Sequence, residues 1–202
     1  MVSKISATAA AVIGALLAQP AVATDADRPG LTVVTSPQPL PADRRAATVF
    51  LGGSIDMGKA PDWQREVIEA LTDENAVILN PRRADWNPAW RPVADDPNFR
   101  TQVEWELSAL ESADVIVIFL ASGSQSPISL LELGLHAREG RLVVYCQKGY
   151  WREGNVDITA ARYGIRTVSS VDELIGEVRA RIRRLRPRSS ARARRGAHQT
   201  VR

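Results

Sequence analysis

Six consecutive apolar residues at 115–120, Val-Ile-Val-Ile-Phe-Leu, predict a strand that has no polar face. Such a strand needs cover on both sides, as in a parallel sheet packed between helices. Four more short strands are predicted at residues 47–52, 76–79, 142–146 and 165–168, and they alternate with stretches that carry apolar residues at helical spacing. This alternation predicts an α/β fold, namely a flavodoxin-like, doubly wound, five-stranded parallel sheet in a single domain.

The 202 residues accommodate one such domain, which we expect at residues 47–185. Residues 1–24 combine a lysine, a short apolar stretch and an Ala-Val-Ala sequence, a pattern typical of a signal peptide or of an unstructured extension. A signal peptide implies export, whereas an unstructured extension implies a cytoplasmic protein. Neither interpretation implies a membrane span in the mature chain. Residues 25–46 contain several prolines and predict a linker, whereas residues 186–202 predict a basic, disordered tail.

The distribution of charge and the numbers of cysteine and histidine residues limit the kinds of ligand that the chain is expected to bind. Ten arginines and no acid lie between Arg179 and Arg202, and subtracting their charge from the net +3 leaves −7 for the rest of the chain. The basic balance therefore describes the tail, which could contact nucleic acid, and not a nucleic-acid-binding face of the domain. Because Cys146 is the only cysteine and His136 and His198 are the only histidines, neither a metal nor another cofactor is expected.

In doubly wound sheets, ligands bind beyond the carboxyl ends of the strands where the strand order reverses. This rule selects the loops that follow the predicted strands at 47–52 and 115–120. The first loop contains Gly52, Gly53 and Ser54. Paired glycines let a backbone approach a ligand closely, although they are also typical of an ordinary tight turn. We take these three residues as candidates for binding a substrate.

The second loop leads into a predicted helix. Ser126 followed by Pro127 is typical of a helix N-cap and first helical residue, so Ser129 and Glu132 lie early on that helix. Leucines flank Glu132 and leave little polar face for a surface acid, which favours a carboxyl that points into the cleft. The alternative is a surface carboxylate placed favourably near a helix N-terminus.

The stretch after the second predicted strand reaches the rim of the same cleft. Trp86 could stack on a planar base there, and Arg83 or Asp85 could make polar contacts with it. An ordinary rim loop is the alternative. The other tryptophans are expected to be packing residues, because aromatic side chains most often serve cores: Trp63, Trp90, Trp105 and Trp151.

Four motifs occur in an order and at a spacing that resemble the nucleoside 2-deoxyribosyltransferase superfamily. They are FLGGS at residues 50–54, SADVIV at 112–117, SLLELG at 129–134 and GNV at 154–156. The resemblance covers residues 47–170, and its most specific part is the glutamate-leucine-glycine helix after an alanine-aspartate strand. It implies an enzyme that acts on the N-glycosidic bond of a nucleoside or nucleotide.

The resemblance also implies roles for single residues. Glu132 matches the family's nucleophile, and Glu106 falls where an aspartate transfers a proton near the base. Asn155 matches an asparagine that reaches a neighbouring subunit's site and binds a sugar hydroxyl, which implies a homo-oligomer. Two positions depart from the family: Phe50 replaces a tyrosine that orients the nucleophile, and Ser126 replaces an aspartate.

Carboxylate chemistry is consistent with these roles. Cleavage of an N-glycosidic bond develops positive charge on the sugar, which a carboxylate beneath the ring both stabilises and captures. A second acid, for which Glu106 is the candidate, would protonate the base and would need a raised pKa. Transfer of the sugar to another base or to water would then distinguish a transferase from a hydrolase. The alternative function is a nucleotide-sensing module without turnover, which the two departures favour.

Overall fold

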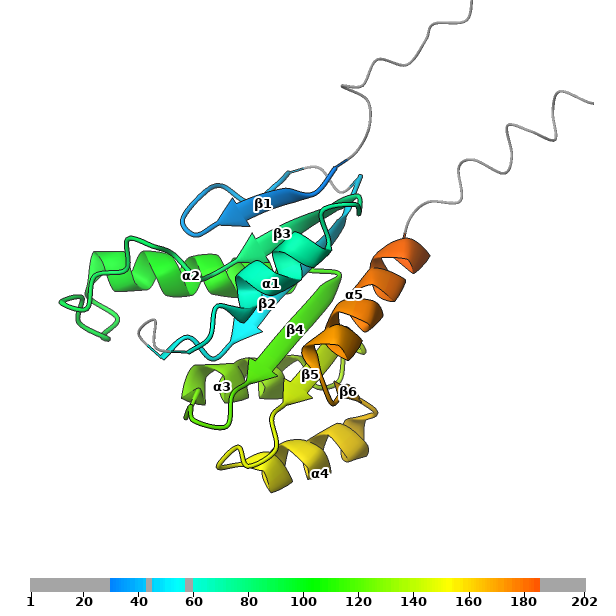
Figure 1. Cartoon of the computed structure of the whole chain (residues 1–202). Helices are drawn as coiled ribbons and strands as arrows, with labels where there is room; N and C mark the ends of the chain where they lie inside the picture. The colour runs from blue at the N-terminus through cyan, green and yellow to red at the C-terminus, as the bar shows by residue number, and fades with distance from the viewer. Residues whose placement is uncertain (1–29, 43–44, 57–59, 186–202) are drawn as a thin grey trace, which may run out of the picture.

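The computed structural model describes residues 30–42, 45–56 and 60–185. The expected extension at 1–24 and the expected tail at 186–202 lie outside these ranges. Within them, six parallel strands form one sheet in the order β1-β3-β2-β4-β5-β6 (Figure 1). The strands are β1 (Thr32–Thr35), β2 (Ala47–Gly53), β3 (Ala76–Asn80), β4 (Val115–Leu120), β5 (Leu142–Cys146) and β6 (Arg166–Val168).

The α/β class and the doubly wound parallel sheet are confirmed, but the prediction of five strands is wrong by one. The additional strand, β1, lies in the proline-containing stretch that we expected to be a linker, and it pairs with β3 from Thr32 opposite Val77 to Thr35 opposite Asn80. It has only four residues, none of which is fully buried. Its sequence therefore lacks the long apolar run that marks the central strands. The sheet therefore begins earlier in the chain than its sequence pattern indicates.

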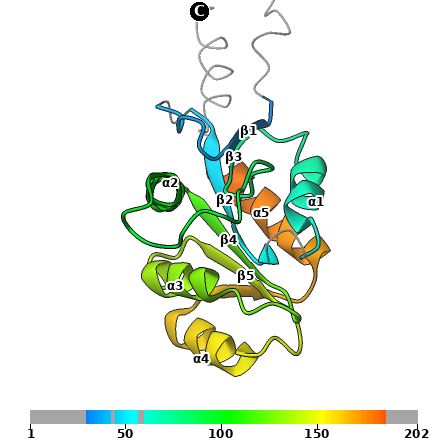
Figure 2. The same cartoon turned by 90° about the vertical axis from the view of Figure 1, so that its left-hand side faces the viewer.

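Helices cover both faces of the sheet, with α2, α3 and α4 on one side and α1 and α5 on the other (Figure 2). They are α1 (Trp63–Ala70), α2 (Pro97–Ser112), α3 (Pro127–His136), α4 (Glu153–Tyr163) and α5 (Val171–Leu185). Successive residues of β4 serve both layers: Val117 packs in the core with α1 and α5, and Ile118 packs in the core with α2, α3 and α4. Each such side chain stabilises the fold by roughly 1.5–3 kcal/mol. None of the described helices has the length and apolar character needed to cross a membrane.

The position of the site follows from the strand order. The chain places β3 on one side of β2 and then crosses to place β4 on the other, so the order reverses between β2 and β4. At the amino ends of these strands, the Asp114 carboxylate accepts hydrogen bonds from the Thr48 backbone N–H (2.8 Å) and hydroxyl (2.9 Å). At their carboxyl ends, Gly53 pairs with Phe119. The predicted switch point is therefore confirmed.

Candidate active site

A cavity of about 830 Å³ opens at the carboxyl ends of β2 and β4. A second cavity of about 490 Å³ adjoins it and shares part of its wall, including Glu106 and Trp86. Together they bring side chains from four separate segments to one place. Of the residues predicted from the sequence, the larger cavity gathers Gly52, Gly53, Trp86, Glu106, Ser126, Ser129 and Glu132.

Three predicted substrate-binding residues line neither of these two cavities. Ser54 is buried behind the wall, where its hydroxyl accepts a hydrogen bond from the Ala121 N–H. The Asp85 side chain is 71% exposed, and its carboxylate accepts hydrogen bonds of 2.7 Å and 2.6 Å from the guanidinium of Arg83. Asn155 lies on α4 and lines a different pocket.

Glu132 is a buried acid at the centre of this arrangement. Its side chain is only 7% exposed, and the structure shows no hydrogen bond to its carboxyl from the described residues. Burial raises the pKa of Glu132 to about 8, and the negative charge of nearby Glu106 adds to the rise. A buried, unpaired carboxyl is costly to a fold, and such groups concentrate at functional sites.

The polar face of α3 is the one turned inward. The buried residues of α3 are Ser129, Glu132, Leu133 and His136, whereas Leu131 and Leu135 are 58% and 55% exposed. An ordinary surface helix would bury its leucines and expose its acid. This helix therefore buries an acid and leaves two leucines exposed.

Gly52 allows Glu132 to lie against the end of β2. A Cβ at this position would lie 3.0 Å from Oε2 of Glu132 and 2.9 Å from Cε1 of Phe50. Gly53, the next residue, has a φ of +148°, and its Cβ would come within 2.3 Å of the Phe119 carbonyl oxygen. The paired glycines thus serve a close approach of backbone and carboxyl, which side chains at these positions would prevent.

Glu106, on α2, is held by a neighbour that the sequence analysis missed. Gln102 is 4% exposed, and its Nε2 donates to Oε1 of Glu106 (2.9 Å) and to the carbonyl oxygen of Pro81 (3.1 Å). Its Oε1 in turn accepts a hydrogen bond of 2.6 Å from the Ser36 hydroxyl, just beyond β1. Gln102 precedes Glu106 by one helical turn, a spacing that could have predicted the contact.

The two acids line the same cavity. Burial raises the pKa of Glu106 as well, and the hydrogen bond from Gln102 partly opposes this rise. Two carboxyl groups that both resist ionisation can supply one proton donor and one carboxylate. That combination is suited to chemistry in which a leaving group must be protonated while positive charge develops nearby.

The raised pKa of Glu132 should make the stability of the protein depend on pH. Between the ordinary value of 4.5 and about 8, the folded chain holds a proton on Glu132 that the unfolded chain has lost. The free energy of unfolding should therefore fall as the pH rises through this window, by about 2–3 kcal/mol between about pH 5.5 and about pH 7.5. Urea unfolding at the two pH values measures the loss. In Glu132→Gln the loss should be much smaller, and an equal loss would contradict the burial of an ionisable carboxyl here.

A chain of hydroxyl groups runs along the wall from the end of β2 to the start of α3. Ser124 donates to Oδ1 of Asp56 (2.8 Å) and contacts the hydroxyl of Ser126 at 2.5 Å, and Ser126 contacts that of Ser54 at 2.6 Å. Because Ala121 N–H donates to Ser54, the three hydroxyls can all point one way and end at the Asp56 carboxylate. Asp56 lines the cavity and was missed in the sequence analysis.

The turn into α3 differs from the predicted cap. Ser126 precedes the helix as expected, and Pro127 opens it, but Ser126 has a left-handed φ of 43° and its side chain caps no backbone N–H. The preceding carbonyl, of Gln125, accepts hydrogen bonds from the Tyr150 hydroxyl (2.6 Å) and the Trp151 indole (2.9 Å). The loop after β5 thus holds the turn, and the Ser126 hydroxyl is left for the hydroxyl chain.

Trp86 presents an unsatisfied donor. Its indole Nε1 is buried and has no hydrogen-bond partner among the described residues, and its ring lies in the wall of both cavities. The other tryptophans divide: Trp63 and Trp105 are buried as expected, whereas Trp151 is 50% exposed, so its prediction as a packing residue is wrong. Its indole Nε1 donates a hydrogen bond to the carbonyl oxygen of Gln125, in the turn before α3.

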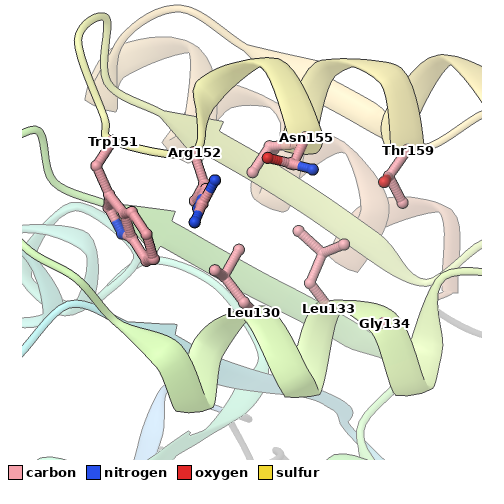
Figure 3. A pocket seen from close by; sticks show the side chains of 8 residues that line it. Leu130, Leu133, Gly134, Trp151, Arg152, Asn155 and Thr159 are labelled. Atoms are coloured by element: carbon pink, nitrogen blue, oxygen red, sulfur yellow. The ribbon is translucent and has the colours of Figure 1, made fainter.

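Asn155 lies in a pocket of about 340 Å³ between α3 and α4. Figure 3 shows Asn155 and Thr159 on α4, facing Leu130 and Leu133 of α3. Glu132 lies on the opposite side of α3, so within one chain Asn155 does not reach the cavity that contains the two acids. A role in binding the sugar would therefore require a second subunit.

The fold and the site define a class: a doubly wound α/β domain whose switch-point cavity contains two acids, the buried Glu132 and the partly buried Glu106. Comparison with protein families gives a match to the family described as nucleoside 2-deoxyribosyltransferase like, over residues 46–150. This match spans more than half of the chain. The protein therefore belongs to the nucleoside 2-deoxyribosyltransferase-like family.

Solved structures include a similar chain. It is the crystal structure of a conserved protein from Enterococcus faecalis V583, which is 14% identical, with a TM-score of 0.49. The similarity covers 67% of the present chain and 99% of the other. A comparison with curated proteins gives no match.

Proposed function

We propose that the protein cleaves the N-glycosidic bond of a nucleoside, with Glu132 as the nucleophile and Glu106 as the acid that protonates the departing base. The observation that carries this proposal is the Glu132 carboxyl, which is 7% exposed and has no hydrogen-bond partner among the described residues. It lines a cavity large enough for a nucleoside and shares that cavity with Glu106. Membership of the family supports a nucleoside-related glycosyl transfer.

The proposed first step uses both acids. An oxygen of the Glu132 carboxylate attacks C1′ of the sugar, and the bond from C1′ to the base nitrogen breaks with its electron pair on the base. Glu106 gives its proton to the base, which leaves as a neutral molecule. Because Glu132 holds a proton below about pH 8, that proton must first pass to water. The positive charge that develops on the sugar then favours the ionised form of Glu132, because opposite charges attract strongly in a buried site.

The second step returns Glu132 to its starting state. Water, or a second base, attacks C1′ of the glycosyl-enzyme, and the bond to the Glu132 oxygen breaks. The Glu106 carboxylate now accepts the proton of the incoming nucleophile. Attack by water makes the protein a hydrolase, and attack by a base makes it a deoxyribosyltransferase.

The base is proposed to lie against Trp86. This side chain borders both cavities, next to Glu106 and Gln102. The ring lies in the wall of both cavities and offers a stacking surface for the base. The sugar would then lie towards Glu132 and the turn at Ser126 and Ser129.

We further propose that the protein acts as a homo-oligomer. The outer face of α3 exposes Ile128, Leu131 and Leu135, and the neighbouring Leu107 of α2 is 43% exposed. These four side chains also line the mouth of the cavity. A second copy of the chain would cover them, exclude water from the reaction and allow its Asn155 to approach a site. Light scattering of the purified chain should give a dimer or a larger assembly, and a monomer would contradict this part of the proposal.

One assay tests the proposed function. The full chain is incubated with deoxyribonucleosides, ribonucleosides and their monophosphates, with and without a second free base, and the products are separated by chromatography. Release of a base supports cleavage, and exchange of bases identifies transfer. Tight binding without release would instead support a nucleotide-sensing module, which the absence of a hydroxyl on Phe50 favours.

A further inference from the structure

The side-chain amide of Gln102 makes four hydrogen bonds within the protein. Its Nε2 donates to the Pro81 carbonyl oxygen (3.1 Å) and to Oε1 of Glu106 (2.9 Å). Its Oε1 accepts from the Ser36 hydroxyl (2.6 Å) and from the Arg83 guanidinium (3.4 Å). An amide has two N–H donors and two lone pairs on its oxygen, so all four positions are used. Gln102 therefore serves its neighbours and not a ligand, although it borders both cavities.

Two of these partners fix the orientation of the amide. The Pro81 carbonyl can only accept a hydrogen bond, and the Arg83 guanidinium can only donate one. The Gln102 nitrogen must therefore face Pro81, and its oxygen must face Arg83. A flipped amide would bring two oxygens together at Pro81 and two donors together at Arg83, and unmade hydrogen bonds of buried groups are costly. Gln102 thus presents an N–H, and not a lone pair, to Glu106.

This orientation determines which oxygen of Glu106 can carry a proton. Oε1 accepts the hydrogen bond from Gln102, so a proton on that oxygen would compete with the N–H that already points at it. The described residues make no hydrogen bond to the other oxygen, Oε2. The proton of Glu106 therefore belongs on Oε2. An acid is effective only when its proton lies within hydrogen-bond reach of the group that takes it.

The amide is also held from the segment that follows β1. Ser36 is 3% exposed, and its backbone N–H donates to the Asn80 carbonyl oxygen (3.2 Å), where β1 ends its pairing with β3. Two residues later, the Gln38 carbonyl oxygen accepts a hydrogen bond of 2.7 Å from the indole of Trp105, the residue before Glu106. Two contacts thus join this segment to the part of α2 that carries Glu106.

We propose that Gln102, held by Ser36, is a positioning residue that keeps the proton of Glu106 on the carboxyl oxygen that Gln102 does not contact, an inference that rests on the proposed function. When the base departs, this proton passes to a base nitrogen, and the electron pair of the O–H bond stays on the Glu106 carboxylate. The family match begins at residue 46, so Ser36 lies outside the matched residues. Strand β1 contributes to the reaction because it places the hydroxyl that holds the amide.

The test measures single-turnover release of base by the full chain from an unmodified deoxyribonucleoside and from N7-methylated deoxyguanosine. The methylated base already carries positive charge and leaves without a proton from the enzyme. Gln102→Met keeps the length of the side chain and removes the amide. On the unmodified nucleoside it should lower the maximal rate by about 10-fold or more and change the half-saturating concentration by less than about 2-fold. On the methylated nucleoside the rate should stay within about 3-fold of the wild-type rate.

Two substitutions at Ser36 test the hydroxyl by itself. Ser36→Ala removes one of the two donors to Oε1 of Gln102 and should lower the rate on the unmodified nucleoside by about 3–10-fold. Ser36→Thr keeps the hydroxyl and should restore the rate to within about 2-fold of the wild-type rate. Ser108→Ala is the matched control, because its hydroxyl donates to the Glu104 carbonyl oxygen on an exposed part of α2. It should leave both rates unchanged.

The outcomes separate this inference from the proposed function. Equal losses on both nucleosides in Ser36→Ala and Gln102→Met, or a loss that appears only as weaker binding, would show a merely structural role and overturn the inference, while cleavage by Glu132 would stand. Full activity of both variants on the unmodified nucleoside would overturn it as well. If the wild-type chain releases no base from either nucleoside, the proposed function is contradicted and the role of Gln102 falls with it.

Discussion

Glu132→Gln should reduce the rate of base release by a factor on the order of 10⁴ or more, as expected when a nucleophile is removed from a group of residues that act together. The amide has nearly the same size as the carboxyl, so the cavity and the binding of the nucleoside should change little. What is lost is the negative oxygen that attacks C1′ and stabilises the charge on the sugar. Single-turnover measurements of free base, at saturating nucleoside, give the rate of the chemical step.

Further variants show whether the loss of base release depends on the charge and the position of the Glu132 carboxyl. Glu111→Gln makes the same change on an exposed part of α2 and should leave the rate unchanged. Gly52→Ala places a methyl group 3.0 Å from Oε2 of Glu132 and should reduce the rate by about 10²-fold, because small displacements of a reacting group are costly. Gly176→Ala, whose Cβ would meet nothing within 4 Å, is its control. Full activity in Glu132→Gln would refute the assignment.

Glu106→Gln should reduce base release by about 10²–10⁴-fold, the usual contribution of a general acid. The amide oxygen can still accept the hydrogen bond of 2.9 Å that Gln102 donates to Glu106, so the position of the side chain should be kept. The proton is absent, and the base must therefore leave as an anion. The loss should appear in kcat, with a small change in the affinity for the nucleoside.

A nucleoside with a better leaving group tests this role separately. The base of an N7-methylated deoxyguanosine already carries positive charge and leaves without a proton from the enzyme. Glu106→Gln should cleave this substrate within about 10-fold of the wild-type rate, since the general acid is not needed. Glu132→Gln should fail on both substrates. An equal loss on both substrates in Glu106→Gln would show that Glu106 does not act as the proton donor.

The sheet was largely predictable because its central strands are apolar on both faces. The runs that became β2 to β5 need cover on two sides, and that requirement alone indicates a parallel sheet between helices. The switch point followed from the strand order, and it located the loops after β2 and β4. Strand β1 was missed because its four residues lie at an edge of the sheet and are recruited by pairing with β3, which no local pattern shows.

The sequence predicted the part of the candidate site that lies on one helix, α3. It did not predict the contacts between segments that are far apart in the chain. The leucines around Glu132 favoured a carboxyl in the cleft, and the carboxyl is there, yet Leu131 and Leu135 are exposed. The prediction thus succeeded although its assumption about the leucines was only partly right. Asp56 and Ser124 are 68 residues apart, and Ser36 and Gln102 are 66 residues apart. Contacts of this kind depend on the folded sheet.

The central claim is that Glu132 forms a bond to the sugar. A 2′-fluoro nucleoside should slow the second step, because fluorine destabilises the positive charge at C1′, and mass spectrometry of the digested protein would then locate any adduct. We expect the mass of the fluorinated sugar on the peptide that contains Glu132, and no adduct in Glu132→Gln. An adduct on another residue, or the same adduct in Glu132→Gln, would contradict the account.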